Sequence, residues 1–165
     1  MNELENKIYD EISIGDHCDY KKTLTESDLI LFATVSGDVN PVHLDADFAK
    51  GTMFKERIAH GMWSGSLVSA TLATVMPGPG TIYLNQSFNF LRPVKLGDTL
   101  TVTLTAKQKN DDKQTVIFDC LVVNQDKKTV LTGDAKVIAP NEKIIIKRPI
   151  LPAVSISNAL ESDVA

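Results

Sequence analysis

Residues 61–76 read GMWSGSLVSATLATVM, and this uncharged stretch decides the fold class. No Asp, Glu, Lys or Arg occurs anywhere in residues 58–91. A membrane-spanning helix needs about 20 predominantly apolar residues, but this segment is shorter, is rich in Ser, Thr and Gly, and runs into Pro77-Gly78. A helix without charge outside a membrane is normally buried. The stretch therefore predicts one buried helix at the centre of a domain, and no membrane partner.

The residues after this helix change to a two-residue apolar period, which predicts strands. In the first strand one face is apolar: Ile82, Leu84, Phe88 and Phe90. The other face carries Tyr83, Asn85, Ser87 and Asn89. Residues 99–106 then alternate apolar side chains with threonine, which suits the solvated side of a sheet.

Polar turns at residues 110–113 and 124–127 introduce two further strand patterns, residues 115–123 and 129–138. Three consecutive strands joined by short turns form an antiparallel meander. Because one uncharged helix must be covered by long strands, the economical arrangement is a sheet curved around that helix. The sequence therefore predicts an α+β fold.

The segment before the buried helix predicts a short helix followed by a polar loop. Thr25 and Asp28 have the spacing of a capping box, and apolar residues then recur at helical spacing until Gly37. Gly37 and Pro41 mark residues 36–43 as a loop rather than a helix.

Composition narrows the function classes. The 165 residues include 17 basic and 21 acidic side chains, a formal charge of -4, with no Lys/Arg-rich run, so nucleic acid is not an expected partner. Cys18 and Cys120 are too few for a disulfide framework or a cysteine-rich zinc module. The first twenty residues lack the basic start and apolar stretch of a secretory signal. We expect a cytoplasmic protein.

The periodic pattern ends near Ala139, after which prolines and small polar residues dominate. We expect a folded domain at residues 1–140 and a C-terminal tail or linker at residues 141–165. Residues 144–146 could add a short edge strand.

The predicted loop reads SGDVNPVH and contains the groups that acid–base chemistry needs. Asp38 offers a carboxylate, Asn40 an amide and His43 an imidazole. Adding water to a carbon skeleton, or removing it, requires one group to take a proton and another to give one. Taken singly, each residue has a structural interpretation, because Asp and Asn commonly cap turns and a lone histidine is often a hydrogen-bonded core residue.

In combination, the motifs resemble the MaoC-type (R)-specific enoyl-CoA hydratases over roughly residues 16–140. The matching segments are SGDVNPVHLD at residues 36–45, IAHGM at 58–62, GTIYL at 80–84, RPV at 92–94 and GD at 97–98. The resemblance implies a hot-dog fold, in which an antiparallel sheet wraps a long helix. It also implies hydration of trans-2-enoyl-CoA to (R)-3-hydroxyacyl-CoA, with no cofactor because coenzyme A is part of the substrate.

The same resemblance implies a role for each motif residue. Asp38 would orient and deprotonate the water, and His43 would hold the reacting groups or supply a proton. Asn40 would fix the water or the pair formed by Asp38 and His43. Gly61, at the helix N-terminus, would offer its backbone N–H to the thioester oxygen. Three further residues are expected at the substrate: Ser69, His60 and Met62. Of these, we expect His60 to shape the entrance to the helix rather than to act in the chemistry.

Two other classes of function are also compatible with the sequence. The first is another hot-dog enzyme, either an acyl thioesterase or a dehydratase acting on acyl carrier protein. The absence of Asp and Glu from residues 61–76 counts against the thioesterase, which generally places its carboxylate on or near the central helix. The second is a non-catalytic acyl-thioester binding or dimerisation module, which would leave Asp38 and His43 without a function.

The resemblance also sets expectations for partners. A single hot-dog sheet usually pairs with a second copy, so we expect a homodimer or higher homo-oligomer that binds an acyl-CoA thioester. Residues 142–152 resemble the connector that joins such a hydratase to a phosphate acetyl- or butyryltransferase domain. No metal is expected, because zinc needs three or four ligands and the chain has only three histidines, with His17 distant in sequence.

Overall fold

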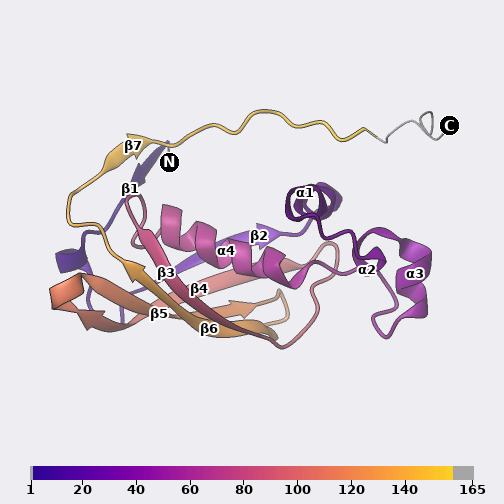
Figure 1. Cartoon of the computed structure of the whole chain (residues 1–165), viewed down its shortest axis with the longest axis horizontal. Coiled ribbons are helices and arrows are strands. Elements are labelled where there is room, and N and C mark those ends of the chain that lie inside the picture. The colour runs from indigo at the N-terminus through magenta and orange to yellow at the C-terminus, as the bar shows by residue number, and fades with distance from the viewer. Residues whose placement is uncertain (1, 158–165) are drawn as a thin grey trace.

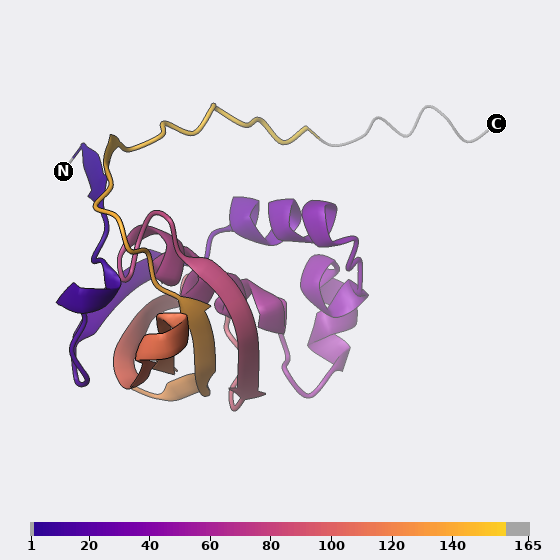
Figure 2. The ribbon, with the colours of Figure 1, turned by 60° about the vertical axis from the view of Figure 1, so that its left-hand side comes forward.

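A five-stranded antiparallel sheet wrapped around one helix dominates the computed structural model, which describes residues 2–157 (Figure 1). The helix is α4, Gly61–Thr74. The strands follow the spatial order β2 (His17–Thr23), β4 (Thr99–Asn110), β5 (Thr115–Val123), β6 (Thr129–Ile138) and β3 (Ile82–Phe90). Figure 2 shows how strongly the strands curve. The arrangement is the α+β, hot-dog architecture that the sequence predicts.

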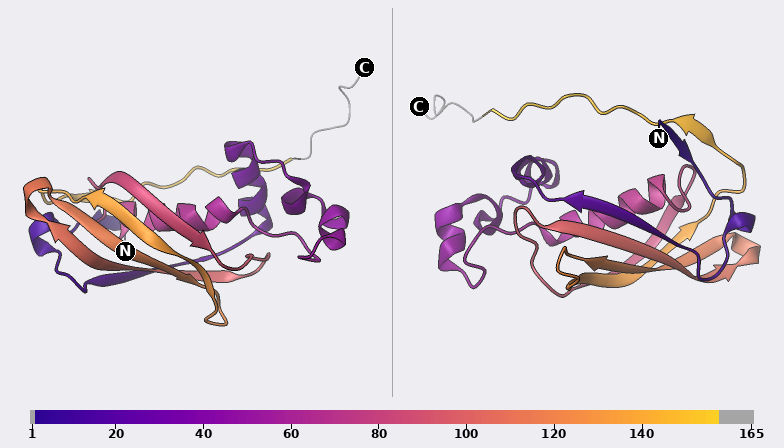
Figure 3. Two further views of the ribbon diagram at one scale, coloured as in Figure 1. Left: turned by 60° about the horizontal axis from the view of Figure 1, so that its bottom comes forward. Right: turned by 180° about the vertical axis from the view of Figure 1, so that it is seen from behind.

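The other elements gather at the two ends of the sheet. Three helices, α1 (Glu26–Ser36), α2 (Pro41–Leu44) and α3 (Ala46–Gly51), lie together at one end (Figure 3). At the opposite end β1 (Glu3–Glu5) pairs with β7 (Ile145–Lys147), and short 3₁₀ turns occupy Tyr9–Glu11 and Asp111–Lys113. No helix among residues 2–157 is long and apolar enough to cross a membrane.

The central strands form where the apolar period predicts them. The strands predicted at residues 115–123 and 129–138 coincide with β5 and β6. On β4, Leu100, Val102 and Leu104 are fully buried, and the threonines between them are partly exposed. Phe118 on β5 heads the largest fully buried side chains of the core. Burial of these alternating residues against α4 supplies the main driving force for folding.

α4 is the predicted buried helix, and it is buried on one face. The side chains that face the core are Trp63, Ser64, Leu67, Val68, Thr71 and Leu72. The opposite face is open to solvent: Gly61, Met62, Ser66, Ser69 and Ala73. One curved sheet covers only the half of a helix that it touches, so the predicted buried helix is buried on one face in the single chain.

β3 departs from its predicted face pattern because it contains a β-bulge. The register with β6 shifts between Tyr83 and Asn85, so Leu84 is an extra residue. One inserted residue moves the preceding side chains to the opposite face of the strand. Tyr83 consequently lines a hollow beside α4, whereas Ile82 is 56% exposed. The prediction that Ile82 shares a buried face with Phe88 is therefore wrong.

Two glycines allow β3 to approach its neighbours closely. A Cβ atom on Gly65 of α4 would lie 2.8 Å from the Phe88 ring, and one on Gly133 of β6 would lie 1.8 Å from the Ser87 carbonyl oxygen. Real Cβ atoms do not occupy such positions. Glycine at these two sites therefore holds β3 against both the helix and β6.

The segment after β6 is attached to the N-terminus. The Asn6 side chain donates to the carbonyl oxygens of Pro79 at 3.1 Å and Glu142 at 2.9 Å, and accepts the Ile144 N–H at 2.9 Å. The possible edge strand at residues 144–146 occurs as β7, paired with β1 rather than with the main sheet. The division into a domain and a tail stays a prediction, and residues 158–165 of that tail lie outside the described residues.

Candidate active site

The site begins at the end of α1, whose start is capped as predicted. The Thr25 side chain accepts the Asp28 N–H at 3.2 Å, and the Asp28 carboxylate accepts the Thr25 N–H at 2.9 Å. At the other end, Gly37 has φ 74° and ends the helix in the left-handed conformation that favours glycine. The chain turns there and enters the segment that carries Asp38.

His43 lies on a helical turn, not on a loop as predicted. The Asn40 side chain accepts the Val42 N–H at 3.2 Å and caps α2. Pro41 occupies the first helical position, where its missing N–H removes no hydrogen bond. The sequence signal of Pro41 is thus a helix start rather than a loop marker, and the turn fixes the direction in which His43 projects.

Asp38 is oriented by contacts within its own turn. Its N–H donates to Ser36 Oγ at 3.2 Å, and its Oδ1 accepts the Asn40 N–H at 3.2 Å. Its other carboxylate oxygen, Oδ2, lies 3.9 Å from His43 Nε2. The Asp38 side chain is 52% exposed, so this oxygen can receive a proton from a molecule that enters the site.

His43 is held in one tautomer. Its Nδ1 lies 2.8 Å from the Ile58 carbonyl oxygen, and because a carbonyl only accepts, Nδ1 carries the hydrogen. In the neutral ring Nε2 then presents a lone pair towards Asp38. The 3.9 Å separation between the two side chains exceeds a direct hydrogen bond and leaves room for a bridging water.

His60 packs directly behind this pair. It is 2% exposed, and its Nε2 lies 2.9 Å from the Asp38 carbonyl oxygen, to which it donates. Its ring stacks on the His43 ring, with centroids 3.8 Å apart, and packs against the Phe32 ring, with centroids 5.1 Å apart. Its Nδ1 is buried and has no hydrogen-bond partner among the described residues.

Gly61 places the start of α4 beside the histidines. Its N–H is at the first helical position, where no intrahelical acceptor exists and the helix dipole favours negative charge. Gly61 lines a cavity of about 390 Å³ together with His43, His60, Ser64, Phe90 and Arg92. A carbonyl oxygen that enters this cavity can accept the Gly61 N–H.

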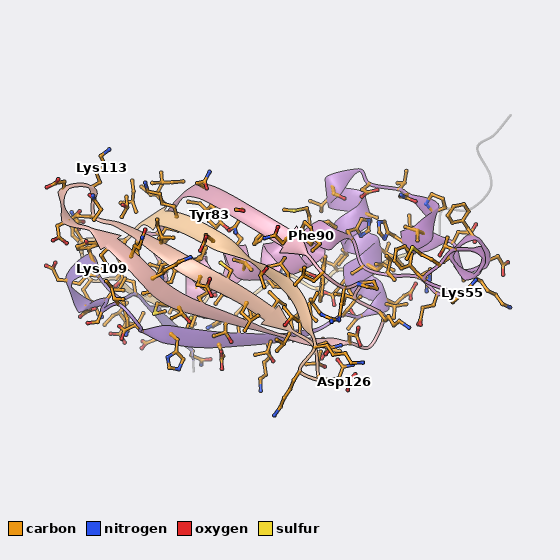
Figure 4. The ribbon with its side chains drawn as sticks, turned by 90° about the horizontal axis from the view of Figure 1, so that it is seen from below. Lys55, Tyr83, Phe90, Lys109, Lys113 and Asp126 are labelled. Atoms are coloured by element: carbon orange, nitrogen blue, oxygen red, sulfur yellow. The ribbon has the colours of Figure 1, made fainter. Side chains whose placement is uncertain are left out.

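Two of the predicted substrate residues lie in a different hollow. Met62 and Ser69, on the open face of α4, line a hollow of about 360 Å³ with Phe32, Tyr83, Gln86 and Phe88. Tyr83 and Phe90 stand well apart along β3 and mark the two cavities (Figure 4). Burial raises the pKa of Tyr83 to about 12, so its hydroxyl stays protonated and donates to Gln86. Met62 and Ser69 therefore line a different cavity from His43, His60 and Gly61.

The donor set does not resemble a metal centre, although Asp38, His43 and His60 each place a ligand atom within 4.8 Å of the others. The two imidazole rings are stacked face to face, with centroids 3.8 Å apart and an interplanar angle of 30°. Ligands of one tetrahedral ion must instead converge on it. The expectation of no metal stays a prediction, now with this geometric argument behind it.

Some functional contacts could not be found from side-chain patterns. The acceptor that fixes the His43 tautomer is the main-chain oxygen of Ile58, and the acceptor for His60 is the main-chain oxygen of Asp38. Phe32 packs on His60, but its position on the apolar face of a predicted helix indicates only a core residue. Arg92 lines the cavity with Gly61, and its sequence signal is limited to the RPV motif.

Residues 11–126 match the model of the protein family described as MaoC like domain. The chain is 45% identical over 134 residues to the (R)-specific enoyl-CoA hydratase of Rhodospirillum rubrum, a match that covers 80% of this chain and 91% of that protein. It is 36% identical over 143 residues to the 3-hydroxybutyryl-CoA dehydratase of Methylorubrum extorquens, covering 87% and 90% of the two chains. The unliganded R-hydratase PhaJ1 from Pseudomonas aeruginosa superposes with a TM-score of 0.91 at 51% identity, covering 94% of this chain and 99% of that one.

Proposed function

The chain belongs to the family of MaoC-like domains, and from this premise we propose that it is a hydro-lyase that adds water to trans-2-enoyl-CoA and yields (R)-3-hydroxyacyl-CoA. The observation that carries the proposal is the 3.9 Å gap between Asp38 Oδ2 and His43 Nε2, because His43 also lines one cavity together with Gly61. The (R) configuration is proposed from the named activities of the relatives.

The gap between Asp38 and His43 suits one water molecule. Neutral His43 accepts one water hydrogen at Nε2, and Asp38 Oδ2 accepts the other. With both hydrogens engaged, a lone pair of the water oxygen is free to attack C3 of the enoyl thioester. The two side chains thus orient the nucleophile as well as receive its proton.

The remaining steps require charge stabilisation and proton return. As the water oxygen bonds to C3, the electrons of the C2–C3 double bond shift towards the thioester carbonyl, whose oxygen accepts the Gly61 N–H. A proton of the water passes to Asp38, and the dyad returns one proton to C2. One hydroxyl and one hydrogen are added across the double bond, and no oxidant or cofactor takes part.

The two cavities suit the two ends of the substrate. We assign the acyl chain to the apolar hollow at Met62 and Ser69, and the polar carrier to the cavity at Arg92. The Arg92 guanidinium donates to the Thr129 carbonyl oxygen at 2.6 Å and keeps further N–H groups for a phosphate. Raising the salt concentration should therefore increase KM for crotonyl-CoA more than it lowers kcat.

The free edge of β3 supports a homodimer. β3 is hydrogen-bonded to β6 on one side only, and it exposes Ile82, Tyr83, Leu84 and Phe90. The other edge strand, β2, instead carries charged side chains of the kind that discourage pairing. We propose that two copies pair along β3, in the reducing cytoplasm that the free thiols of Cys18 and Cys120 would suit.

Light scattering on wild type and on Leu84→Asp tests this arrangement. The charge should convert the dimer to a monomer, whereas Lys21→Asp on β2 should leave it unchanged. A monomeric wild type, or a Leu84→Asp variant that stays dimeric, contradicts pairing through β3.

Hydration of crotonyl-CoA, followed by loss of the enoyl-thioester absorbance, tests the activity itself. We expect wild type to hydrate it to the (R) product, identified by chiral chromatography. Asp38→Asn and His43→Gln should each lose about 10²- to 10⁴-fold in kcat. Asp47→Asn, the same change at an exposed position a few residues away, is the matched control and should keep full activity. A wild type without hydration, or an Asp38→Asn variant as fast as wild type, refutes the proposal.

A further inference from the structure

His60 touches both halves of the candidate site. It directly precedes Gly61 at the start of α4, and its side chain reaches the segment that carries Asp38. We propose that His60 is a positioning residue that fixes the Asp38 carboxylate relative to the Gly61 N–H and thereby sets the rate of hydration. The inference rests on the proposed hydratase function and assigns a role that the sequence expectation for His60, an entrance or substrate contact, does not include.

The hydrogen bond between His60 and Asp38 differs in range from the other bonds of Asp38. The contacts with Ser36 Oγ and the Asn40 N–H each span two residues, so they fix the local shape of the turn. The bond from His60 Nε2 to the Asp38 carbonyl oxygen spans 22 residues. This longer-range bond places the turn relative to α4, and with it the distance from the carboxylate to the oxyanion donor.

The ring of His60 also supports the other member of the dyad. It stacks on His43 with centroids 3.8 Å apart and an angle of 30° between planes, and Phe32 packs on it at 5.1 Å. The orientation of the His43 ring is thus set by the hydrogen bond of its Nδ1 to the Ile58 carbonyl and by the stacking of His60 on its face. One side chain orients both groups that hold the water.

The unpartnered Nδ1 of His60 is unfavourable for stability. Because Nε2 carries the hydrogen that Asp38 accepts, Nδ1 is an acceptor, and it is buried without a donor in the described part of the chain. A buried unsatisfied acceptor destabilises a fold. Phenylalanine would fill the same space without that cost, and glutamine would keep the N–H without the flat ring. Histidine combines the ring with the donor.

His60→Phe tests the proposal because it keeps the ring and removes the donor. We expect a thermal midpoint equal to or above that of wild type, together with a loss of about 100-fold in kcat for crotonyl-CoA, the size of effect that a misplacement of about 1 Å produces. KM should stay close to the wild-type value, since phenylalanine keeps the ring that lines the cavity. His60→Gln, whose amide nitrogen can reach the same carbonyl, should recover most of kcat.

Hydrogen exchange of the peptide covering residues 37–43 gives a readout that does not depend on activity. Exchange should accelerate in His60→Phe and return towards wild type in His60→Gln. His17→Phe, on the exposed edge strand β2, is the matched control and should change neither kcat nor exchange. A His60→Phe enzyme with wild-type kcat and exchange overturns the positioning role.

A His60→Gln variant that loses kcat while His60→Phe keeps it would also overturn the positioning role through Asp38, because it would assign the effect to ring stacking alone. If wild type itself hydrates nothing, the proposed function fails instead. The exchange measurement then still decides whether His60 places the Asp38 segment.

Discussion

The strands at residues 99–138 and the segment at residues 25–60 are held together in different ways. The strands bury an unbroken apolar set and satisfy their backbone through ladders of strand pairing. The 25–60 segment consists of three short helices with few buried residues, and side chains cap its turns at Thr25, Asn40 and Asp45. Substitutions in the strands should therefore change stability, whereas those in the segment should change the rate.

Phe118→Ala should show the largest effect on the stability side of this comparison. Phe118 is fully buried on β5, and truncating a buried phenylalanine typically costs about 3–5 kcal/mol. We expect urea unfolding to show this loss while kcat per folded molecule stays unchanged. Leu121→Ala, on the same strand but 36% exposed, is the matched control and should cost about 1 kcal/mol or less. A large fall in kcat of folded Phe118→Ala would break the comparison.

The same division explains what the sequence can predict. The bounds of β5 and β6 follow from the period because every second residue repeats the signal. The bulge at Leu84 and the helical turn at Pro41 each depend on one residue, so they leave no repeating pattern in the sequence. Burial of one face of α4 depends on how much of the helix the sheet covers, and the sequence of α4 does not indicate that area.

The candidate site was predictable in its parts but not in its assembly. Asp38, His43 and Gly61 stand out by residue type and motif, and the structure brings the first two to 3.9 Å. Their placement depends on main-chain oxygens, such as that of Ile58, which have no signature in a sequence. Ser69 belongs to a separate hollow because it lies on the open face of α4.

Asn40→Ala and Asn110→Ala make the same chemical change in the two regions. Asn40 caps α2 through the Val42 N–H, and Asn110 caps the 3₁₀ turn after β4 through the Lys113 N–H at 3.1 Å. Loss of such a cap costs about 1 kcal/mol, so both variants should lose similar stability in urea. Only Asn40→Ala should lose kcat, about 10- to 100-fold, because His43 sits on the turn it caps. Asn40→Ser should restore it. Equal kcat in the two alanine variants would contradict the comparison.

Acidification should loosen α1 through Asp28. Partial burial alone would raise the pKa of Asp28, but hydrogen bonds from Thr25 and Lys22 outweigh it and hold the pKa below its usual value. A carboxylate with a lowered pKa stabilises the fold above its unfolded pKa of about 4, and this contribution disappears as pH falls through the folded value. The free energies of unfolding of wild type and Asp28→Asn, measured in urea, should therefore differ at pH 7 by about 1 kcal/mol or less and converge in acid. A difference that persists at low pH would contradict this assignment.

The smallest effects should come from two exposed ion pairs, one in each region. Arg57 forms a bidentate pair with Glu26 at 2.7 and 2.6 Å, and Lys107 pairs with Asp134 at 2.9 Å on the sheet. Exposed pairs contribute about 0.2–1 kcal/mol, so Glu26→Gln and Asp134→Asn should barely move the urea midpoint, and less still at high salt. The pair at Glu26 nevertheless joins the first turn of α1 to the segment that leads into His60 and Gly61. Glu26→Gln should therefore lower kcat by a few-fold while Asp134→Asn leaves it unchanged. Steady-state kinetics at low and high salt would decide this, because equal kcat in both variants would mean that the 25–60 segment is no more sensitive than the sheet.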